Sequence, residues 1–532
     1  MNTIMELIDF ATLKYGDNPA VKYELVGSVV EKSYVTLKND ILVIGRLLQK
    51  KGLKNSHIAI IGSFCYDWLV SYFAIICSGN VAIPIDKDLS VHDIAVLMQQ
   101  ADTEVAFIDG DNHTLLAYLS EYLIKAENIF TFASLQSSLS TNYTINNMFE
   151  EVTLDPDQLA MIVFTSGTTG SNKGVMLTHR NLCQDMLHSV NLIGKESPKG
   201  HLFATLPPHH MMLVTISIMA PVYLGNAICY CKSRKQLMKS IKFFHPWLIA
   251  LVPVIIETIH NRIWMDARQS GKEKKLKAGI KLSNFLRLFG IDIRRKIFKE
   301  IHDIFGGQLE FIISGGAYLD PKLAVEFEEF GILLRNGYGI TECSPVVCCN
   351  KPGLMRSGSV GRVLDHSYCE VRIINGEICV KGPIVMKGYY KDDKATMEAF
   401  DGEWFKTGDL GYIDDDGYLF ITGRKKNLII LSDGNNISPE ALEQLLEPIS
   451  LIKTGYICAR IENGIQIITA CIFPDKEYAH DNGITDIQAD LQRQINDINK
   501  GLPRYAKIQK IEISENDFET TALGKVKRYL YE

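Results

Sequence analysis

The clearest chemical signal in the sequence is a loop rich in small hydroxyl residues and glycine. It follows an apolar run, residues 159–164, suited to a buried strand, and consists of Thr165, Ser166, Gly167, Thr168, Thr169, Gly170, Ser171, Asn172 and Lys173. Hydroxyl groups donate hydrogen bonds, glycines let backbone N–H groups approach an anion closely, and the lysine adds a positive charge. The pattern therefore predicts a cradle for a polyphosphate.

Two other interpretations of the loop are weaker. It is not a Walker A loop, because that motif places four residues between its first glycine and Gly-Lys-Ser/Thr, whereas Lys173 follows Asn172. A flexible linker is the second alternative, but linkers seldom lie tight against a buried strand or lead into an ordered run such as residues 173–177. We therefore favour phosphate binding.

Five further strings follow the loop along the chain. They are Leu206-Pro207-Pro208-His209-His210, Asn336-Gly337-Tyr338-Gly339-Ile340-Thr341-Glu342, Thr407-Gly408-Asp409, Gly423-Arg424-Lys425-Lys426 and Gly524-Lys525. Together with the loop, and in this order, they resemble the adenylate-forming superfamily of acyl-CoA synthetases, non-ribosomal adenylation domains and firefly luciferase. The resemblance spans nearly the whole chain. It implies that a carboxylic acid reacts with ATP to give acyl-AMP and pyrophosphate, and that the acyl group then passes to a thiol.

The resemblance also implies roles in nucleotide binding. Thr165 and Glu342 would hold Mg²⁺ beside the phosphates, and Thr341 would contact the α-phosphate. Asp409 would accept hydrogen bonds from the ribose hydroxyls, with Arg424 donating nearby. The remaining residues would wrap the β- and γ-phosphates (Ser166, Gly167, Thr168, Thr169, Gly170, Lys173) or surround adenine (Gly315, Gly316, Ala317, Asn336, Gly337, Tyr338, Gly339), with Tyr338 stacking on the base. Core packing of Tyr338 and an ordinary strand exit at Gly315-Gly316 are the alternatives.

For the reaction itself, the resemblance points to Lys525, Lys426 and His210. Lys525 would bridge the attacking carboxylate and the phosphate, and Lys426 would be the hinge about which a small C-terminal domain swings. His210 would be a wall or gate of the acyl site. It is not expected to bind metal with His209, because adjacent side chains diverge in a strand.

The chain departs from the family pattern at two positions. Asn427 replaces an acidic residue that is common after the hinge, and Ile430 stands where some long-chain members carry a lysine. Both departures weaken the case for the contacts of thiol transfer more than for those of adenylation.

Residues 307–317 and 431–440 look like the long-chain acyl-CoA synthetase branch. Apolar stretches expected to wall the acyl site, such as residues 251–256, contain no charged residue, which disfavours an amino-acid substrate. We expect a fatty acid, with CoA as the thiol co-substrate. An acyl-AMP ligase that loads the phosphopantetheine thiol of an acyl carrier protein, or makes another acyl conjugate, is the alternative. A non-catalytic nucleotide-binding protein is disfavoured because Glu342, Asp409 and Lys525 are all present.

One basic segment lies outside these motifs. Residues 268–299 contain 11 Lys or Arg and 2 Asp or Glu, and apolar residues recur in the segment at helical spacing: Leu276, Ile280, Leu282, Phe285, Leu286 and Phe289. Such a segment can lie on an anionic membrane or dock an acidic carrier protein. From the sequence alone we favour a third interpretation, in which it is a solvated helical face that packs on its own domain.

The motifs need a large α/β scaffold to position them. Strand-like runs such as 57–61 and 81–85 alternate with helical patterns such as 67–77 and 92–100, which predicts two α/β layers. Short strands and turns from residue 368 to residue 430 predict a β-rich subdomain. We therefore expect an α/β protein with a large N-terminal AMP-binding domain over residues 1–426 and a small, mobile α+β lid domain over residues 427–532.

Composition and charge order limit the expected partners and cellular location of the protein. The net charge of −6 from 56 basic and 62 acidic residues selects no partner, so no nucleic acid is expected. Acidic residues precede Lys14, unlike in a secretory signal, so we expect a cytoplasmic protein, with peripheral membrane association left open. The 12 cysteines show no CxxC pair or zinc-ligand spacing and should be reduced and buried. Residues 211–230 are uncharged, but Pro221, Gly225 and Asn226 favour a buried helix, turn and strand over a membrane span.

Overall fold

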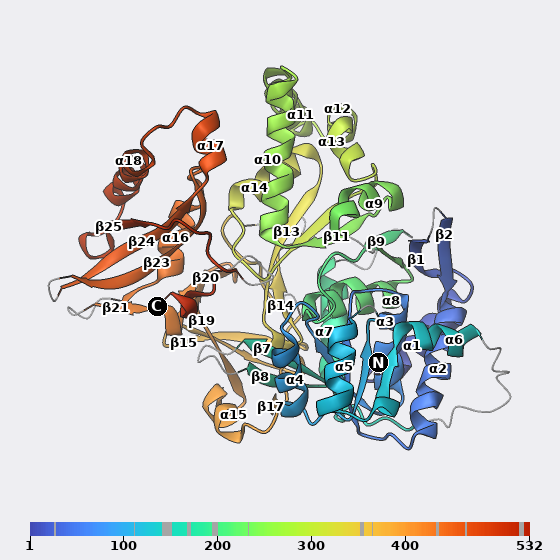
Figure 1. Cartoon of the computed structure of the whole chain (residues 1–532). Coiled ribbons are helices and arrows are strands. Elements are labelled where there is room, and N and C mark those ends of the chain that lie inside the picture. Colours follow the sequence, from blue (N-terminus) through green and yellow to red (C-terminus); the bar gives the residue numbers. More distant parts are fainter. Residues whose placement is uncertain are drawn as a thin grey trace.

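The computed structural model places two large sheets and a smaller C-terminal unit along the chain (Figure 1). It describes residues 1–25, 28–110, 112–140, 152–166, 172–193, 200–231, 234–351, 356–363, 365–431, 436–462, 465–520 and 526–531. The predicted α/β architecture is confirmed.

An eight-stranded sheet and a seven-stranded sheet form the two α/β layers. In spatial order the first contains β14 (Val346–Cys349), β13 (Leu333–Gly339), β12 (Phe311–Ser314), β11 (Leu248–Leu251), β9 (His201–Phe203), β10 (Ala227–Tyr230), β1 (Pro19–Leu25) and β2 (Ser28–Ser33). The second contains β17 (Gly388–Tyr389), β8 (Asn172–Thr178), β7 (Leu159–Ser166), β4 (Val81–Ile85), β3 (His57–Ile61), β5 (Val105–Ile108) and β6 (Ile129–Thr131). Strands inside both sheets are parallel, and β2, β8, β14 and β17 join antiparallel.

Helices cover both faces of the two sheets. Those of the N-terminal half are α1 (Ile4–Tyr15), α2 (Tyr34–Lys50), α3 (Tyr66–Cys77), α4 (Val91–Gln100), α5 (His113–Tyr122), α6 (Phe132–Ser140), α7 (His179–Ile193), α8 (Ala220–Leu224) and α9 (Leu237–Phe244). They are followed by α10 (Pro253–Gln269), α11 (Glu273–Arg287), α12 (Arg294–Ile297), α13 (Lys299–Ile304), α14 (Pro321–Phe330) and α15 (Asp393–Ala399).

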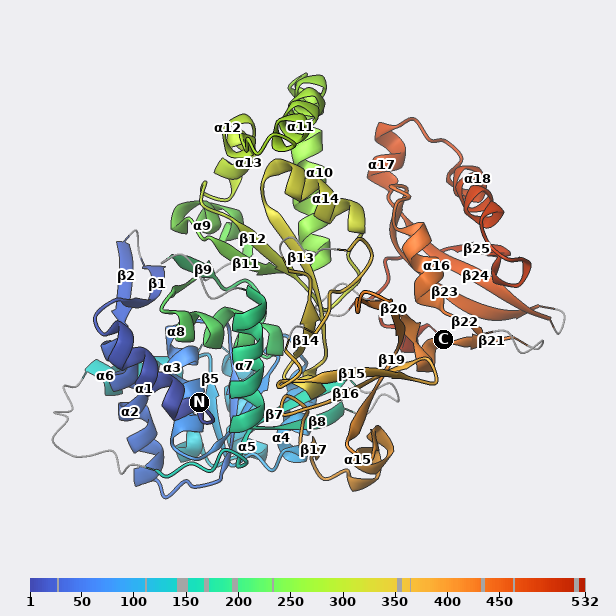
Figure 2. The same ribbon diagram turned by 180° about the vertical axis from the view of Figure 1, so that it is seen from behind.

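The largest core lies between the two sheets. Alternate strand residues point to opposite faces, so Ile58 and Ile60 enter this core with α1, α2, α3 and α7, while Ala59 and Ile61 pack under α4 and α5. The other face of the eight-stranded sheet packs against α9, α10, α13 and α14. Figures 1 and 2 show α10 and α11 extending beyond this sheet.

The β-rich subdomain and the C-terminal unit follow. The subdomain contains β15 (Glu370–Ile374), β16 (Glu377–Lys381), β18 (Phe400–Asp401), β19 (Trp404–Ile413) and β20 (Leu419–Arg424). The C-terminal unit contains β21 (Ile429–Ile430), β22 (Asn436–Ile437), β23 (Ile452–Glu462), β24 (Ile465–Pro474), β25 (Lys510–Ile513), α16 (Pro439–Leu446), α17 (Lys476–Asp481) and α18 (Ile487–Lys500). It has its own core, around Leu442, Ile457 and Leu491. The boundary after residue 426 stays a prediction.

The uncharged run at residues 211–230 is buried, as expected. It begins with a π-helical segment, η2 (Leu213–Met219), continues as α8, turns at Gly225 (φ 78°) and ends as β10. Among the residues that the structure describes, we find no helix of the length and apolarity that a bilayer crossing requires. None of the cysteines, all of which lie in the described residues, forms a disulfide, and all except Cys65 and Cys231 are buried, as predicted.

Candidate active site

The hydroxyl-rich loop connects two antiparallel strands at the edge of the seven-stranded sheet. In β7 and β8, Thr165 pairs with Lys173 and Ser166 with Asn172, so the loop is the end of a hairpin. Gly167, Thr168, Thr169 and Gly170 lie outside the described residues. The Lys173 ammonium lies 4.7 Å from the ring centroid of Tyr389, whose strand β17 is the next neighbour of β8. A cation over an aromatic face is an attractive contact, so Tyr389 supports Lys173.

Tyr389 also contacts the predicted magnesium ligand. Its hydroxyl donates to Glu342 Oε1 at 3.0 Å. Glu342 lies in a short 3-10 helix, η4 (Thr341–Cys343), just after β13, and the Glu342 carbonyl oxygen accepts from Met386 N at 2.8 Å. One tyrosine thus joins the hairpin that carries Thr165 and Lys173 to the turn that carries Thr341 and Glu342.

The Glu342 carboxylate is held in a protected environment. Burial raises its pKa, while the Tyr389 hydrogen bond and the Arg424 guanidinium favour the ionised form. A carboxylate that is partly removed from water gains strongly from a nearby cation. The site therefore combines a desolvated anion with neighbouring positive charge.

The turn after Glu342 is fixed from three directions. Ser344 has a left-handed backbone (φ 73°), and its hydroxyl donates to the Ile384 carbonyl at 2.8 Å. Thr215 of η2 donates to the Ser344 carbonyl at 2.9 Å. Asp185 of α7 accepts from Val346 N at 2.9 Å. These contacts define where Glu342 points.

A second cluster lies beside Glu342 and contains the predicted ribose ligand. Asp409 of β19 accepts from the Tyr338 hydroxyl at 2.8 Å and from Arg424 Nε at 2.8 Å, one bond on each carboxylate oxygen. Asp409 and Arg424 are cross-strand partners in β19 and β20. Tyr338 is buried, so its ring joins the central core and its hydroxyl links the eight-stranded sheet to the β-rich subdomain. The sequence placed these residues on one nucleoside, and the structure brings them together. Their contacts with a base and a ribose stay predictions.

Two buried polar atoms lie where the parallel pairing of two neighbouring strands ends. Ser314 of β12 pairs with Asn336 of β13, and neither Ser314 Oγ nor Asn336 Oδ1 has a hydrogen-bond partner among the described residues. Buried polar atoms are usually satisfied, so an unpartnered pair is a place where a ligand can bond. Gly315, Gly316 (φ 82°) and Ala317 follow directly, and Gly337 and Gly339 flank Tyr338 in β13. This edge fits a heterocyclic base with hydrogen-bonding groups.

His210 lies near this edge, but in a turn and not in the strand we expected. Its backbone N–H donates to the Pro207 carbonyl at 3.0 Å, and η2 begins shortly after it. Burial, with His209 adding to the effect, lowers the pKa of His210 to about 4, so its ring is neutral at pH 7. A neutral ring suits the wall of an apolar site. Met212 Sδ would lie 3.4 Å from a Cβ atom at Gly315, which places this turn beside the base edge.

The apolar stretch expected to wall the acyl site has mixed surroundings. Leu251 and Ile256 pack into the outer core between the eight-stranded sheet and α10 and α14, whereas Val252 faces the central core. The direction of Leu251 and Ile256 could not be read from an uninterrupted apolar run. Only part of this stretch is therefore available to a substrate.

The predicted hinge connects β20 to the C-terminal unit through a 3-10 turn, η5 (Lys425–Asn427). Removal from water and the neighbouring Arg424 lower the pKa of Lys426 to about 8. The Asn427 side chain, one of the two departures, donates to Glu440 of α16, and Ile430, the other, is exposed. Lys525 lies outside the described residues, between Thr520 and Val526, which form an isolated bridge.

A carboxyl of the C-terminal unit lies near carboxylates carried by helices of the eight-stranded sheet. Glu447 caps α16, Glu257 belongs to α10 and Asp320 caps α14. Burial, and then the charges of Glu257 and Asp320, raise the pKa of Glu447 to about 8. Burial and Asp320 likewise raise the pKa of Glu257.

The oxygen ligands in this region fit magnesium. No group of three or more His, Cys, Asp or Glu able to hold a metal occurs in the part of the chain that the structure describes. Mg²⁺ is typically held by one or two protein oxygens and by water and substrate phosphates, so the Thr165 hydroxyl and the Glu342 carboxylate match its chemistry.

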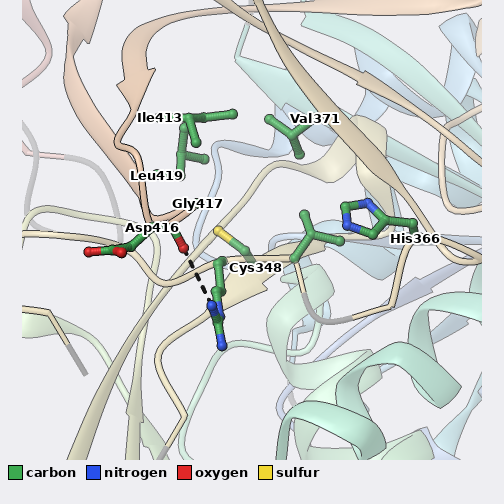
Figure 3. Close-up of a pocket in the computed structure, with 9 residues that line it drawn as sticks. Cys348, His366, Val371, Ile413, Asp416, Gly417 and Leu419 are labelled. Carbon is green, nitrogen blue, oxygen red and sulfur yellow. Dashed lines mark hydrogen bonds between the residues drawn. The ribbon is translucent and has the colours of Figure 1, made fainter. Parts of the chain in front are cut away.

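A hollow in the β-rich subdomain lies apart from these residues. It has a volume of about 320 Å³ and is lined by Cys348, Arg362, Val363, His366, Val371, Ile413, Asp416, Gly417 and Leu419 (Figure 3). Arg362 donates to the Asp416 carbonyl at 3.4 Å across one side. None of the predicted nucleotide-binding residues lines it.

The sequence of the chain matches a known protein family. The sequence profile of the family described as AMP-binding enzyme matches residues 9–390, well over half of the chain. The chain belongs to the AMP-binding enzyme family. The family and the type of enzyme predicted from the sequence are thereby confirmed.

Curated relatives of this AMP-binding enzyme cover most of the chain. The "Long-chain-fatty-acid--CoA ligase FadD15" of Mycobacterium bovis is 28% identical over 520 residues, which are 88% of this chain and 85% of that protein. The "Long chain acyl-CoA synthetase 7, peroxisomal" of Arabidopsis thaliana is 28% identical over 475 residues, covering 79% of this chain and 65% of that protein.

Solved structures share the fold. The o-succinylbenzoate CoA synthetase of Bacillus subtilis, in complex with its acyl-adenylate intermediate, has a TM-score of 0.77 at 20% identity and covers 99% of this chain and 98% of its own. A fatty acyl CoA synthetase of Mycobacterium tuberculosis has a TM-score of 0.69 at 18% identity and covers 100% of this chain and 97% of its own. At these identities the likeness shows the fold of the AMP-binding enzyme.

Sequence reasoning missed Tyr389 altogether. Its only local signal is a Gly-Tyr-Tyr string at residues 388–390, which gives no spacing to a partner. The role of Tyr389 depends on β17 pairing with β8, a contact between segments more than 200 residues apart. The short η4 helix that aims Glu342 at this tyrosine was equally invisible.

We predict that Tyr389→Phe raises the Mg²⁺ concentration needed for activity by about tenfold or more. The variant keeps the ring under Lys173 but removes the hydroxyl on Glu342, and a hydrogen bond to a charged group contributes about 1.5–3 kcal/mol. The matched control is Tyr390→Phe, which removes a hydroxyl from the exposed Asp102 carboxylate. Mg²⁺ titrations of pyrophosphate release measure the effect. Identical titrations for Tyr389→Phe and wild type would refute the role of Tyr389.

We further predict that Asp409→Ala weakens ATP binding by about 1–3 kcal/mol, the scale of hydrogen bonds to a charged group. Isothermal calorimetry with ATP measures the change, and Asp416→Ala, an exposed carboxylate of the same subdomain, is the control. Because Tyr338 and Arg424 lose an acceptor, the melting temperature is recorded for both variants. An unchanged ATP affinity in folded Asp409→Ala would remove Asp409 from the nucleotide site.

Proposed function

We propose that this protein is a fatty acyl-CoA synthetase that works inside the cell. In the first step a fatty-acid carboxylate attacks the α-phosphorus of ATP, forming acyl-AMP and releasing pyrophosphate. In the second, the thiolate of CoA attacks the acyl carbonyl and releases AMP. The names of the curated relatives, which are long-chain fatty-acid CoA ligases, support both the acid and the acceptor.

One observation carries the proposal. Tyr389 and Glu342 join the hydroxyl-rich hairpin to a cluster of Tyr338, Asp409 and Arg424. The first group suits a metal-bound triphosphate, and the second suits a nucleoside. Their adjacency is reflected in Glu342, whose pKa responds to both Arg424 and Asp409.

The chemistry requires positive charge, because a carboxylate must approach an ATP that carries about four negative charges. Two unit charges 4 Å apart interact by roughly 4 kcal/mol at an effective dielectric constant of 20, so each cation matters at the scale of a catalytic barrier. Lys173 and Arg424 are two of the described cations of the site. Mg²⁺, held by Thr165 and Glu342, would neutralise phosphate charge, in keeping with a relative solved with ATP and magnesium.

We assign the base to the edge formed by Ser314, Asn336 and the glycines around them. The unpartnered Asn336 amide oxygen can accept a hydrogen bond from the exocyclic amino group of adenine. We propose that the base stacks on the Tyr338 ring. Asp409 has one bond on each oxygen and can accept two more from ribose hydroxyls.

We propose that Lys525 arrives from the C-terminal domain, residues 427–532, to bridge the carboxylate and the α-phosphate. Rotation about Lys426 would bring Lys525 in for adenylation and remove it for thiol entry. The neutral ring of His210 would line the acyl site without competing for the carboxylate as a cation. An acyl carrier protein in place of CoA is the alternative acceptor, and peripheral contact with an anionic membrane through residues 268–299 is part of the proposal.

A panel of acids tests the proposed function. Purified protein with ATP and Mg²⁺ is expected to release pyrophosphate with fatty acids, and to form AMP and a thioester when CoA is added. Short acids and amino acids serve as controls. If none of the acids leads to pyrophosphate release, adenylation is refuted. Turnover with a carrier-protein thiol but not with CoA would select the alternative acceptor.

We predict that Lys525→Ala abolishes acyl-AMP formation and leaves ATP binding largely intact, because the lysine acts on the reacting groups and the other contacts hold the nucleotide. Lys527→Ala is the matched control, since Lys527 pairs with Glu519 on the surface. Mass-spectrometric detection of acyl-AMP and calorimetry with ATP separate the two effects. Adenylation by Lys525→Ala at the wild-type rate would show that the assignment is wrong.

A further inference from the structure

The helix that carries the basic segment extends away from the two large sheets. In Figures 1 and 2, α11 lies at the end of the molecule where α10 also terminates, away from α4 and α5. α10 begins at Pro253, directly after β11, and its 17 residues span about 25 Å. The segment is therefore presented outward on a long helix.

One side of α11 packs on the protein. Leu276 and Ile280 contact the outer core, Asn284 donates to Glu329 at 2.7 Å, and Arg287 pairs with Glu328 at 3.0 Å. These positions recur every three or four residues and form one helical face. This face is the helical face that we expected from the sequence to pack on its own domain. It includes only some of the apolar side chains of residues 268–299.

The remaining apolar side chains gather at the C-terminal end of α11 and in the turn after it. This apolar tip consists of Leu282, Phe285, Leu288, Phe289 and Ile291, whose exposed fractions are 51%, 57%, 80%, 66% and 50%. The rings of Phe285 and Phe289 pack edge to face with centroids 5.2 Å apart. Single exposed apolar residues are normal on a protein surface, but five within ten residues form a patch that marks an interaction site.

Lysines without an ion pair lie in the same segment as the tip. Lys274, Lys275, Lys281 and Lys296 are exposed and form no ion pair with any described residue. Other basic residues of the segment are paired, as in Lys277–Glu273 and Lys299–Asp303. Since residues 268–299 carry an excess of nine positive charges while the whole chain has a net charge of −6, the rest of the protein is negative.

We infer that the apolar tip docks on an anionic lipid bilayer, with its aromatic and aliphatic side chains in the headgroup boundary and the unpaired lysines of the segment facing lipid phosphates. The inference rests on the proposed function for its purpose, because a membrane is where fatty acids partition. Exposed apolar residues in a segment rich in unpaired lysine are the pattern of an interfacial anchor. An acidic carrier protein would satisfy the lysines and leave the tip uncovered. The negative remainder of the chain is repelled by the same surface, so the molecule docks with this tip first.

Vesicle co-sedimentation of the full chain tests the docking surface. Wild type is expected to bind phosphatidylcholine vesicles that contain phosphatidylglycerol at low salt, and to bind pure phosphatidylcholine much less. Lys274→Gln/Lys281→Gln/Lys296→Gln should weaken binding at least tenfold, because each surface lysine contributes substantially to attraction by anionic lipid. Phe285→Ser/Leu288→Ser/Phe289→Ser should abolish the binding that persists at high salt.

The matched control is Leu13→Ser/Met397→Ser, which removes apolar side chains of comparable exposure, 91% and 78%, elsewhere on the surface. It should bind as wild type does. Melting temperatures and pyrophosphate release from dispersed fatty acid are recorded for every variant. Because sedimentation needs no turnover, an inactive protein that still binds vesicles would contradict only the proposed function.

Three results would overturn the docking surface. They are a wild type that does not sediment with anionic vesicles, tip and lysine variants that bind as well as wild type, and capture of an acyl carrier protein by the lysines without vesicle binding.

Discussion

The contact between the Tyr389 hydroxyl and the Glu342 carboxylate is the interaction on which the site depends. A buried carboxylate is expensive unless it is paired, and its pKa rises when it loses water. The tyrosine supplies one hydrogen bond at 3.0 Å, to Glu342 Oε1. Its ring faces the Lys173 ammonium, so the same residue fixes the position of Glu342 relative to the hydroxyl-rich hairpin. Moving β17 by one residue would turn Tyr389 to the other face of the sheet and lose both contacts.

In the Asp409 cluster, too, one side chain links two parts of the structure. Asp409 is buried, and its two partners come from different sheets, Tyr338 from the eight-stranded sheet and Arg424 from the β-rich subdomain. Neither sheet alone could satisfy the carboxylate. The β-rich subdomain is therefore positioned by the same group that is proposed to hold the ribose, and binding and architecture are coupled there.

The sequence predicted the fold class, the buried strand that leads into the loop, and the grouping of Tyr338, Asp409 and Arg424. Those predictions worked because hydrophobic periodicity and turn residues are local, and because the Asn336–Glu342 string covers the end of one strand and the turn directly after it, while Thr407–Asp409 lies within one strand. It missed Tyr389, the turn at His210 and the divided surroundings of residues 251–256. Each of these depends on which strand or helix a distant segment packs against, which periodicity does not encode. The exposed tip of α11 was hidden for a related reason, since the helical spacing of its apolar residues did not show which of them α14 covers.

The C-terminal unit carries a carboxyl that is disfavoured in its ionised form by carboxylates of the large sheets' helices. In the orientation described, loss of water and then the negative charges of Glu257 and Asp320 raise the pKa of Glu447 to about 8. A carboxyl whose pKa is raised by an interface opposes that interface increasingly as pH rises from its ordinary pKa to the elevated value, and by a constant amount above it. Near neutral pH Glu447 therefore keeps its proton in this orientation and would gain ionisation if the C-terminal unit turned away. The Asn427 side chain donates to Glu440 and ties the η5 turn to α16. The proposed movement of Lys525 in and out of the site would need such an arrangement, in which the hinge turn is firm and the opposing surfaces attract only weakly.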